Sequence, residues 1–221
     1  MFKLRGFNLV VLLPAFVLSA CNQTKHQQVY EAEINEWFRL REERLVSKSS
    51  WLSLAGLFGL QDGENTFGGD SSNSIVFPED KAESLLGSFY VRDGKVKVIL
   101  NKNADVTIDG QNITEATLRS DLDGDATMMQ SGSLSWFLIQ RGEQFLIRLK
   151  DSANPAIENF TGIERYPVNS KWRVRAKLKP YHPPKKLEIS NMIGQLSEEE
   201  CAGALVFKID NKECRLDVMG K

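Results

Sequence analysis

Short apolar runs separated by turn-forming residues occupy most of this chain. In residues 51–78, apolar side chains gather in brief runs divided by Gly, Asn and Asp. Runs of this kind are typical of β-strands, and similar runs follow at fairly regular spacing as far as residue 218. The pattern predicts a mainly β fold, an antiparallel β-sandwich, in which the strands from residues 51–78 form the part around which the others pack.

Turn signals divide the predicted strands. Asp-Gly pairs occur at 62–63, 93–94, 109–110 and 123–124. Asp-Gly favours hairpin turns because these residues tolerate positive φ. The clearest hairpin joins residues 133–140 to residues 144–149 through Arg141-Gly142. Later strands are predicted at 172–178, 187–190, 204–209 and 214–218.

A different spacing precedes the first strand. Between residues 29 and 46 the apolar side chains recur at intervals of three and four, which predicts one amphipathic helix. Acidic and basic residues alternate on its other side, which favours packing on the sheet over lying on a membrane surface. The predicted buried face consists of Tyr30, Ile34, Trp37, Phe38, Arg41 and Leu45.

The first twenty residues have the features of a secretory signal. Lys3 and Arg5 precede a mostly apolar run that is too short to span a membrane unaided and ends in Leu-Ser-Ala before Cys21. This ending resembles the lipobox of bacterial lipoproteins, in which the cysteine is lipidated once the signal is cut. We therefore predict a lipoprotein signal peptide over residues 1–20, a lipid-anchored tether over 21–28 and a helix-plus-sandwich domain over 29–221. An ordinary signal followed by a chance cysteine is the alternative.

The residue after Cys21 bears on where the lipoprotein would reside. It is Asn22 and not Asp, which by resemblance to enteric lipoproteins implies the outer membrane, facing the periplasm. Loss of the signal takes two basic residues and no acid, so the net charge moves from -1 to -3. A mildly acidic chain is not typical of nucleic-acid binders. The membrane is thus the expected partner, through the lipid, and any ligand or protein partner stays open.

Few residues offer recognisable catalytic chemistry. The two histidines are His26, in the predicted tether, and His182, in a proline-rich loop. They do not predict a Ser-His-Asp triad, a Cys-His pair or a zinc site. No cofactor is expected.

An acidic segment resembles part of a calcium-binding loop. Asp121, Asp123 and Asp125 stand at alternate positions. The sixth position of the loop should be Gly and the twelfth Glu, but the chain has Ala126 and Gly132 there. We interpret the segment as an acidic turn and predict no metal site.

One predicted strand, residues 172–178, carries a basic face. Its apolar residues alternate with Lys171, Arg173, Arg175, Lys177 and Lys179. Such a face is either a solvated outer surface balanced by acids on neighbouring strands or a contact for anions such as lipid headgroups.

Two cysteines remain once Cys21 is lipidated. Cys201 and Cys214 form an even pair in an oxidising compartment, which favours a disulfide. A turn centred near Asn211-Lys212 would instead place Cys214 opposite Ile209. Both the disulfide and two free thiols stay open.

Several motifs in order resemble one family. The runs WLSLAGLFGLQDGENTFGGDSSNSIVFP, GSLSWFLIQRGEQFLIRLKD, NFTGIERYPVNSKWRVRAKLKPY and PPKKLEISNMIG are similar to the bacterial domain-of-unknown-function family 1684. The similarity covers about residues 34–216 and implies a largely β protein, often secreted or lipid-anchored, with no assigned activity. Family members commonly continue past the equivalent of residue 218 with further strands, so the resemblance implies a chain shortened at the C-terminus. If the missing tail supplies core strands, an unpaired sheet edge is expected here. A natural short member and a truncated reading frame both stay open.

A weaker resemblance concerns the phosphopeptide-binding forkhead-associated sandwich. It rests on GENTFGGDSSNSIVFP, GSFYV and the VTIDGQ run. Gly69 stands where that family needs its phosphate-binding Arg, and no His lies near GSFYV. The resemblance therefore implies sandwich topology and not phosphothreonine binding.

Two hypotheses for function follow. The first is a cell-envelope lipoprotein that serves as a non-catalytic binding or structural module. The alternative is an envelope hydrolase that uses carboxylates near residues 62–70 or 121–136. The sequence alone leaves open whether the chain is an enzyme.

Overall fold

The computed structural model describes residues 15–190, 194 and 196–219, with side chains from residue 25. It divides into two compact units. The sandwich unit is Phe38–Glu164, and the terminal unit combines Met1–Trp37 with Arg165–Lys221. Each unit is described by itself below.

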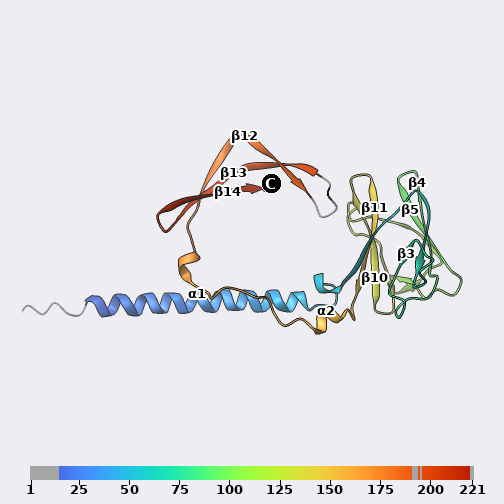
Figure 1. Ribbon diagram of the computed structural model, residues 1–221, viewed down its shortest axis with the longest axis horizontal. Coiled ribbons are helices and arrows are strands. Elements are labelled where there is room, and N and C mark those ends of the chain that lie inside the picture. The colour runs from blue at the N-terminus through green and yellow to red at the C-terminus, as the bar shows by residue number, and fades with distance from the viewer. Residues whose placement is uncertain (1–14, 191–193, 195, 220–221) are drawn as a thin grey trace, which may run out of the picture. The chain divides into compact units, whose positions relative to one another are not determined.

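The sandwich unit consists of two sheets, seen in Figure 1 as the layer with β10 and β11 and the layer with β3, β4 and β5. The six-stranded sheet has the order β1-β11-β10-β9-β6-β7, with the bounds β1 Leu54–Gly59, β6 Thr107–Ile108, β7 Gln111–Asn112, β9 Met128–Ser131, β10 Leu134–Arg141 and β11 Gln144–Asp151. The five-stranded sheet has the order β3-β2-β4-β5-β8, with β2 Gly63–Gly68, β3 Ile75–Val76, β4 Gly87–Arg92, β5 Lys95–Leu100 and β8 Glu115–Leu118. All pairs are antiparallel except β2 with β3. The predicted sandwich is confirmed.

An aromatic cluster fills the space between the two sheets. The rings of Phe67 and Phe89 stack with centroids 4.2 Å apart, and Phe77 meets Trp136 edge-on at 5.2 Å. All four side chains are almost wholly buried, and each contributes roughly 1.5–3 kcal/mol through its burial. Since Phe67 and Phe77 come from residues 51–78, that stretch supplies the centre of the core, as expected.

The turn chemistry predicts some connections and not others. Asp93-Gly94 and Asp109-Gly110 have positive φ and form the tight turns of the β4-β5 and β6-β7 hairpins. The β10-β11 hairpin is also confirmed, although Arg141 pairs with Gln144, which moves its turn one residue on. Asp62-Gly63 does not form a hairpin, because β1 and β2 belong to different sheets. The buried amide of Asn65 holds this crossing, through hydrogen bonds to both main-chain groups of Gln61.

Helix α1, Ala15–Leu45, is longer than predicted (Figure 1). It includes residues 22–28, where we expected a tether. On the predicted face, Tyr30, Ile34, Phe38 and Leu45 are half-buried, whereas Trp37 and Arg41 are exposed. None of the helices within the described residues is long and apolar enough to cross a membrane.

The terminal unit also contains a three-stranded antiparallel sheet. Its strands are β12 Lys177–Ser190, β13 Leu196–Ile209 and β14 Lys212–Met219, in that order. The prediction of a strand over residues 172–178 was wrong in its greater part. Residues 170–172 form the 3-10 turn η2, Ser170–Trp172, and the strand begins at Lys177.

Side-chain hydrogen bonds explain this difference. The side chain of Asn169 accepts a hydrogen bond from the main-chain N–H of Lys171, which caps the turn. The amide of Gln27, on α1, accepts from the N–H of Ser170 and donates to the carbonyl of Val168. Because these main-chain groups bond to side chains, the alternating pattern that follows does not extend into a strand here.

Candidate functional site: a cationic pocket beside Trp51

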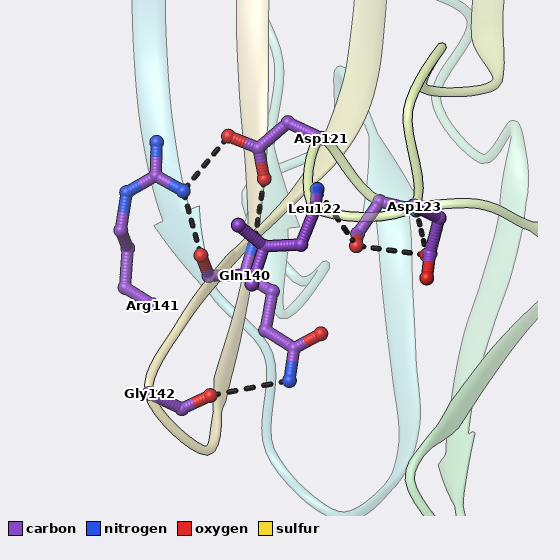
Figure 2. A network of polar contacts seen from close by, with 7 residues as sticks. Asp121, Leu122, Asp123, Gln140, Arg141 and Gly142 are labelled. Carbon is purple, nitrogen blue, oxygen red and sulfur yellow. Dashed lines mark hydrogen bonds and ion pairs between the residues drawn. The ribbon is translucent and has the colours of Figure 1, made fainter. Parts of the chain in front are cut away.

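The acidic segment near residue 121 takes part in a network of hydrogen bonds and one ion pair. Figure 2 shows the guanidinium of Arg141 directed at the carboxylate of Asp121, with 2.8 Å between Nη1 and Oδ2. The other oxygen of Asp121 accepts from the main-chain N–H of Gln140 at 3.0 Å. Asp123 accepts from the N–H and the hydroxyl of Ser120, and these bonds lower the pKa of its carboxyl. Asp121 therefore fixes the loop to the β10-β11 hairpin, whereas Asp123 bonds within the loop itself.

The other acidic region, residues 62–70, is arranged similarly. Glu64 accepts hydrogen bonds from the hydroxyls of Tyr90 and Ser88, and both lower the pKa of its carboxyl. Asp70 accepts from the main-chain N–H of Ser72. A carboxyl whose pKa is lowered is a poor general acid at neutral pH. Within the described part of the chain, no group of three or more His, Cys, Asp or Glu could hold a metal ion.

The five basic residues predicted to share one strand face do not do so. Lys171 lies in η2 over the ring of Trp172, and Arg173 pairs with Glu33 and lies over the ring of Tyr30, both on α1. Arg175 precedes β12 and is exposed. Only Lys177 and Lys179 lie in β12, opposite Val206 and Ala204. An anion contact that uses all five basic residues stays a prediction. The single strand that was expected to align their side chains does not form.

A polar cluster lies on the three-stranded sheet. Asp217 accepts hydrogen bonds from Lys185 at 2.8 Å and from the hydroxyl of Tyr181 at 2.6 Å, and these bonds lower the pKa of its carboxyl. Arg215 donates to the same hydroxyl. Asp217 of β14 lies opposite Ala204 of the central strand β13, and these contacts from β12 therefore cross β13 to reach it. The cluster ties the three strands together and neutralises much of its own charge.

The two later cysteines are free thiols in this structure. The turn at Asp210-Asn211 places Cys214 opposite Phe207, not opposite Ile209 as expected. Cys201 is six residues from Phe207 along β13, a separation of about 20 Å. A disulfide needs Cα atoms closer than roughly 7 Å, so the disulfide hypothesis conflicts with this sheet.

The predicted signal and lipidation site lie largely outside the described residues. Residues 1–14 are not described, and the side chain of Cys21 is not described although its main chain belongs to α1. Lipidation of Cys21 stays a prediction.

A pocket that the sequence did not reveal lies on the sandwich unit. It has a volume of about 220 Å³ and is lined by Ser49, Ser50, Trp51, Leu54, Phe137, Arg148 and Lys150. Strand register brings these residues together. In β11, Arg148 lies opposite Phe137 of β10, and Lys150 lies opposite Leu54 of β1. Their neighbours Ile147 and Leu149 are fully buried in the core, so the pocket side chains occupy the outer face of the sheet.

The pocket combines two cations with apolar surface. The ammonium of Lys150 donates a hydrogen bond of 2.8 Å to the carbonyl oxygen of Ser49 and lies 5.8 Å from the ring centroid of Phe137. Burial and the charge of Arg148 lower the pKa of Lys150. Arg148 itself is half-buried, and its side chain has no hydrogen bond or ion pair among the described residues. None of the described residues that line the pocket is acidic. The pocket therefore combines an unpaired positive charge, on Arg148, with apolar lining residues.

The comparisons with known proteins give a family and no activity. Residues 158–221 match the model of a family described as "Protein of unknown function (DUF1684)". This match supports the family assignment made from the sequence motifs. No curated protein matches the chain.

Proposed function

We propose that this chain, whose residues 158–221 match the DUF1684 model, is a non-catalytic binding module. It binds an anionic ligand in the pocket beside Trp51. The observation that carries the proposal is Arg148. Arg148 is half-buried, lines a pocket next to a second cation, and has a side chain without a hydrogen-bond or ion-pair partner among the described residues. A guanidinium has five N–H donors and pairs well with carboxylates and phosphates.

The electrostatics of the pocket support an anion in particular. Lys150 and Arg148 lie two residues apart on one strand face, and their mutual repulsion contributes to the lowered pKa of Lys150. A bound anion would relieve that repulsion and pair with the donors of Arg148. A neutral or cationic ligand would leave the repulsion in place.

The proposal extends to the location of the module. Cys21 at the end of a lipobox-like run supports a lipid anchor, and Asn22 supports the outer membrane with the domain facing the periplasm. Growth with an alkyne-tagged fatty acid tests this part. The full chain should incorporate the label, and Cys21→Ser should not. Equal labelling of both proteins would refute the anchor.

Binding is tested by thermal melts of the full chain in non-ionic detergent with inorganic phosphate, acetate, citrate and glucose 6-phosphate. At least one anion should raise the midpoint at a fixed ionic strength, because a ligand that binds only the folded state stabilises it. Arg148→Gln should remove the rise, while Arg92→Gln, which changes an exposed arginine at the end of β4, should keep it. If none of the anions raises the midpoint, or if both variants respond alike, the proposed site is wrong.

A further inference from the structure

Building on the proposed anion site, we propose that the pocket selects an acidic sugar: one ring that packs on Trp51, with a carboxylate or phosphate that pairs with Arg148. The starting observation is the indole of Trp51. It is 68% exposed at the edge of the pocket, although the burial of such a ring would stabilise the fold.

The main chain beneath this indole is fixed. Trp51 begins the 3-10 turn η1, Trp51–Ser53, whose N-cap is Ser50. The hydroxyl of Ser50 accepts from the N–H of Leu52 at 3.2 Å, and the buried hydroxyl of Ser53 donates to the carbonyl oxygen of Ser50 at 2.6 Å. An exposed aromatic ring on a hydrogen-bonded turn is an ordered apolar surface that a ligand can cover at little entropic cost.

Two further lining residues add apolar surface beside the cations. The side chains of Leu54 and Phe137 are apolar, and each is cross-strand to one of the two cations. A ligand that fills the pocket must therefore present an apolar face and an acid group close together. The C–H face of a sugar ring supplies the first, and a uronic carboxylate or a sugar phosphate supplies the second. A volume of about 220 Å³ is below the roughly 300–1,000 Å³ of drug-sized sites, which suits a single ring.

The polar groups of the lining separate this ligand class from its neighbours. The side chains of Trp51, Arg148 and Lys150 only donate hydrogen bonds. Among the described side chains that line the pocket, only the serine hydroxyls can accept them. A neutral sugar would offer Arg148 and Lys150 no negatively charged acceptor. A free inorganic anion would leave the surface of Trp51 uncovered.

Calorimetric titration of the full chain in detergent tests the inference with five probes: glucuronate, glucose 6-phosphate, glucose, acetate and inorganic phosphate. At least one of the two acidic sugars should bind ten times more tightly than the other three probes. Whether glucuronate or glucose 6-phosphate is preferred decides between a carboxylate and a phosphate as the recognised group.

Trp51→Ala should weaken binding of the preferred acidic sugar about five- to tenfold, the size expected for one lost ring contact. It should leave the weaker binding of the free anions unchanged. The matched control is Trp172→Ala, since Trp172 is also exposed, at 54%, and does not line the pocket. A melt of each variant confirms that it folds, and Trp51→Phe should keep part of the affinity.

The outcomes separate the two proposals. If acetate or phosphate binds as tightly as the acidic sugars and the binding depends on Arg148, the anion site stands and the sugar inference is refuted. If Trp51→Ala binds the acidic sugars like the unchanged protein, the sugar inference is also refuted. If none of the charged probes binds, both proposals fail.

Discussion

The ammonium group of Lys150 lies 5.8 Å from the ring centroid of Phe137 and donates a hydrogen bond to the carbonyl oxygen of Ser49. These contacts hold the lysine against the outer face of the six-stranded sheet, and Arg148 lies two residues before it on the same strand. The charged form of Lys150 is disfavoured by burial and by that arginine, which is why its pKa is lowered. A bound anion would favour the charged form again. Binding and protonation at this position should therefore be linked.

The first prediction follows from that linkage. Anion affinity should fall as pH rises through the pKa of Lys150, because only the protonated amine attracts the ligand. Since this pKa is lowered, the fall should begin below about 10.4, the ordinary lysine value. Calorimetric titration across a pH series measures it. Lys150→Gln should bind more weakly and lose this part of the pH dependence, whereas Lys102→Gln should behave like the unchanged chain.

A second prediction concerns an ion pair inside the sandwich unit. Lys81, between β3 and β4, pairs with Asp151 at the end of β11, and the Asp151 side chain is only 5% exposed. Lys81→Met should lower the free energy of unfolding by about 3 kcal/mol, because it leaves a buried carboxylate without its partner. Chemical denaturation measures this loss. Lys97→Met removes a cation from a surface pair with Glu115 and should cost less than about 1 kcal/mol. Equal losses in the two variants would contradict the assignment.

The ion pair between Lys81 and Asp151 should also make the stability of the sandwich unit depend on pH. Burial favours a higher pKa for Asp151, but hydrogen bonds from Lys81, Ser133 and Ala153 outweigh it, so the pKa is lowered. The stabilisation from this carboxyl is therefore present above its unfolded pKa of about 3.9 and is lost as pH falls through the lower folded value. The pKa of Lys81 is raised by the hydrogen bond to Asp151, so its contribution is lost only as pH rises beyond about 10.4. The difference in stability between the unchanged chain and Lys81→Met should thus be greatest between these limits and should shrink in acid.

The third prediction tests the packing of the five-stranded sheet. A Cβ added at Gly87 would lie 2.3 Å from the carbonyl oxygen of Ile99 on the neighbouring strand, and the φ of Gly87 is +156°. Gly87→Ala should therefore destabilise the sandwich unit by about 2–4 kcal/mol. Gly59→Ala is the matched control in an exposed strand position, since an added Cβ there meets nothing within 4 Å. Its effect on the midpoint of a thermal melt should be small, and an equal effect would argue against the β4-β5 register.

A fourth prediction concerns the two later cysteines. In the full-length Cys21→Ser variant, Cys214 should react with a thiol reagent under native conditions because it is partly exposed, whereas Cys201 is fully buried. Cys201 should react only after unfolding. Loss of the rapid reaction in Cys214→Ser would assign it. If neither thiol reacts without reductant, even after unfolding, the two are joined and the register of the three-stranded sheet is wrong.

Local sequence patterns predicted those parts of the fold that local chemistry decides. The hairpins at Asp93-Gly94 and Asp109-Gly110 follow from residues that tolerate positive φ, and the helix over Tyr30 to Leu45 was predicted from the spacing of its apolar residues. The strand predicted over 172–178 failed because Gln27 supplies hydrogen bonds from a distant segment. No local pattern could signal that competition.

The candidate site could not be predicted from the sequence, because strand pairing brings its residues together from separate segments. Phe137 and Arg148 become neighbours through the β10-β11 register, and Leu54 meets Lys150 only because β1 pairs with β11. The second pairing joins segments almost one hundred residues apart, and nothing in either segment specifies it. Trp51 was expected to belong to the core stretch. Its exposure follows from the 3-10 turn that precedes β1, which interrupts the strand alternation.

The most direct measurement of the central claim is a titration of the full chain with whichever of glucuronate and glucose 6-phosphate binds more tightly, followed by the indole N–H resonances in proton–nitrogen NMR spectra. The chain has four tryptophans, and Trp51→Phe and Trp172→Phe assign two of the signals. An anion in the pocket should shift the Trp51 resonance in a saturable manner and leave the Trp172 resonance in place, and Arg148→Gln should abolish the shift. A Trp51 resonance that stays unchanged at saturating ligand, or one that shifts equally in Arg148→Gln, would contradict the account.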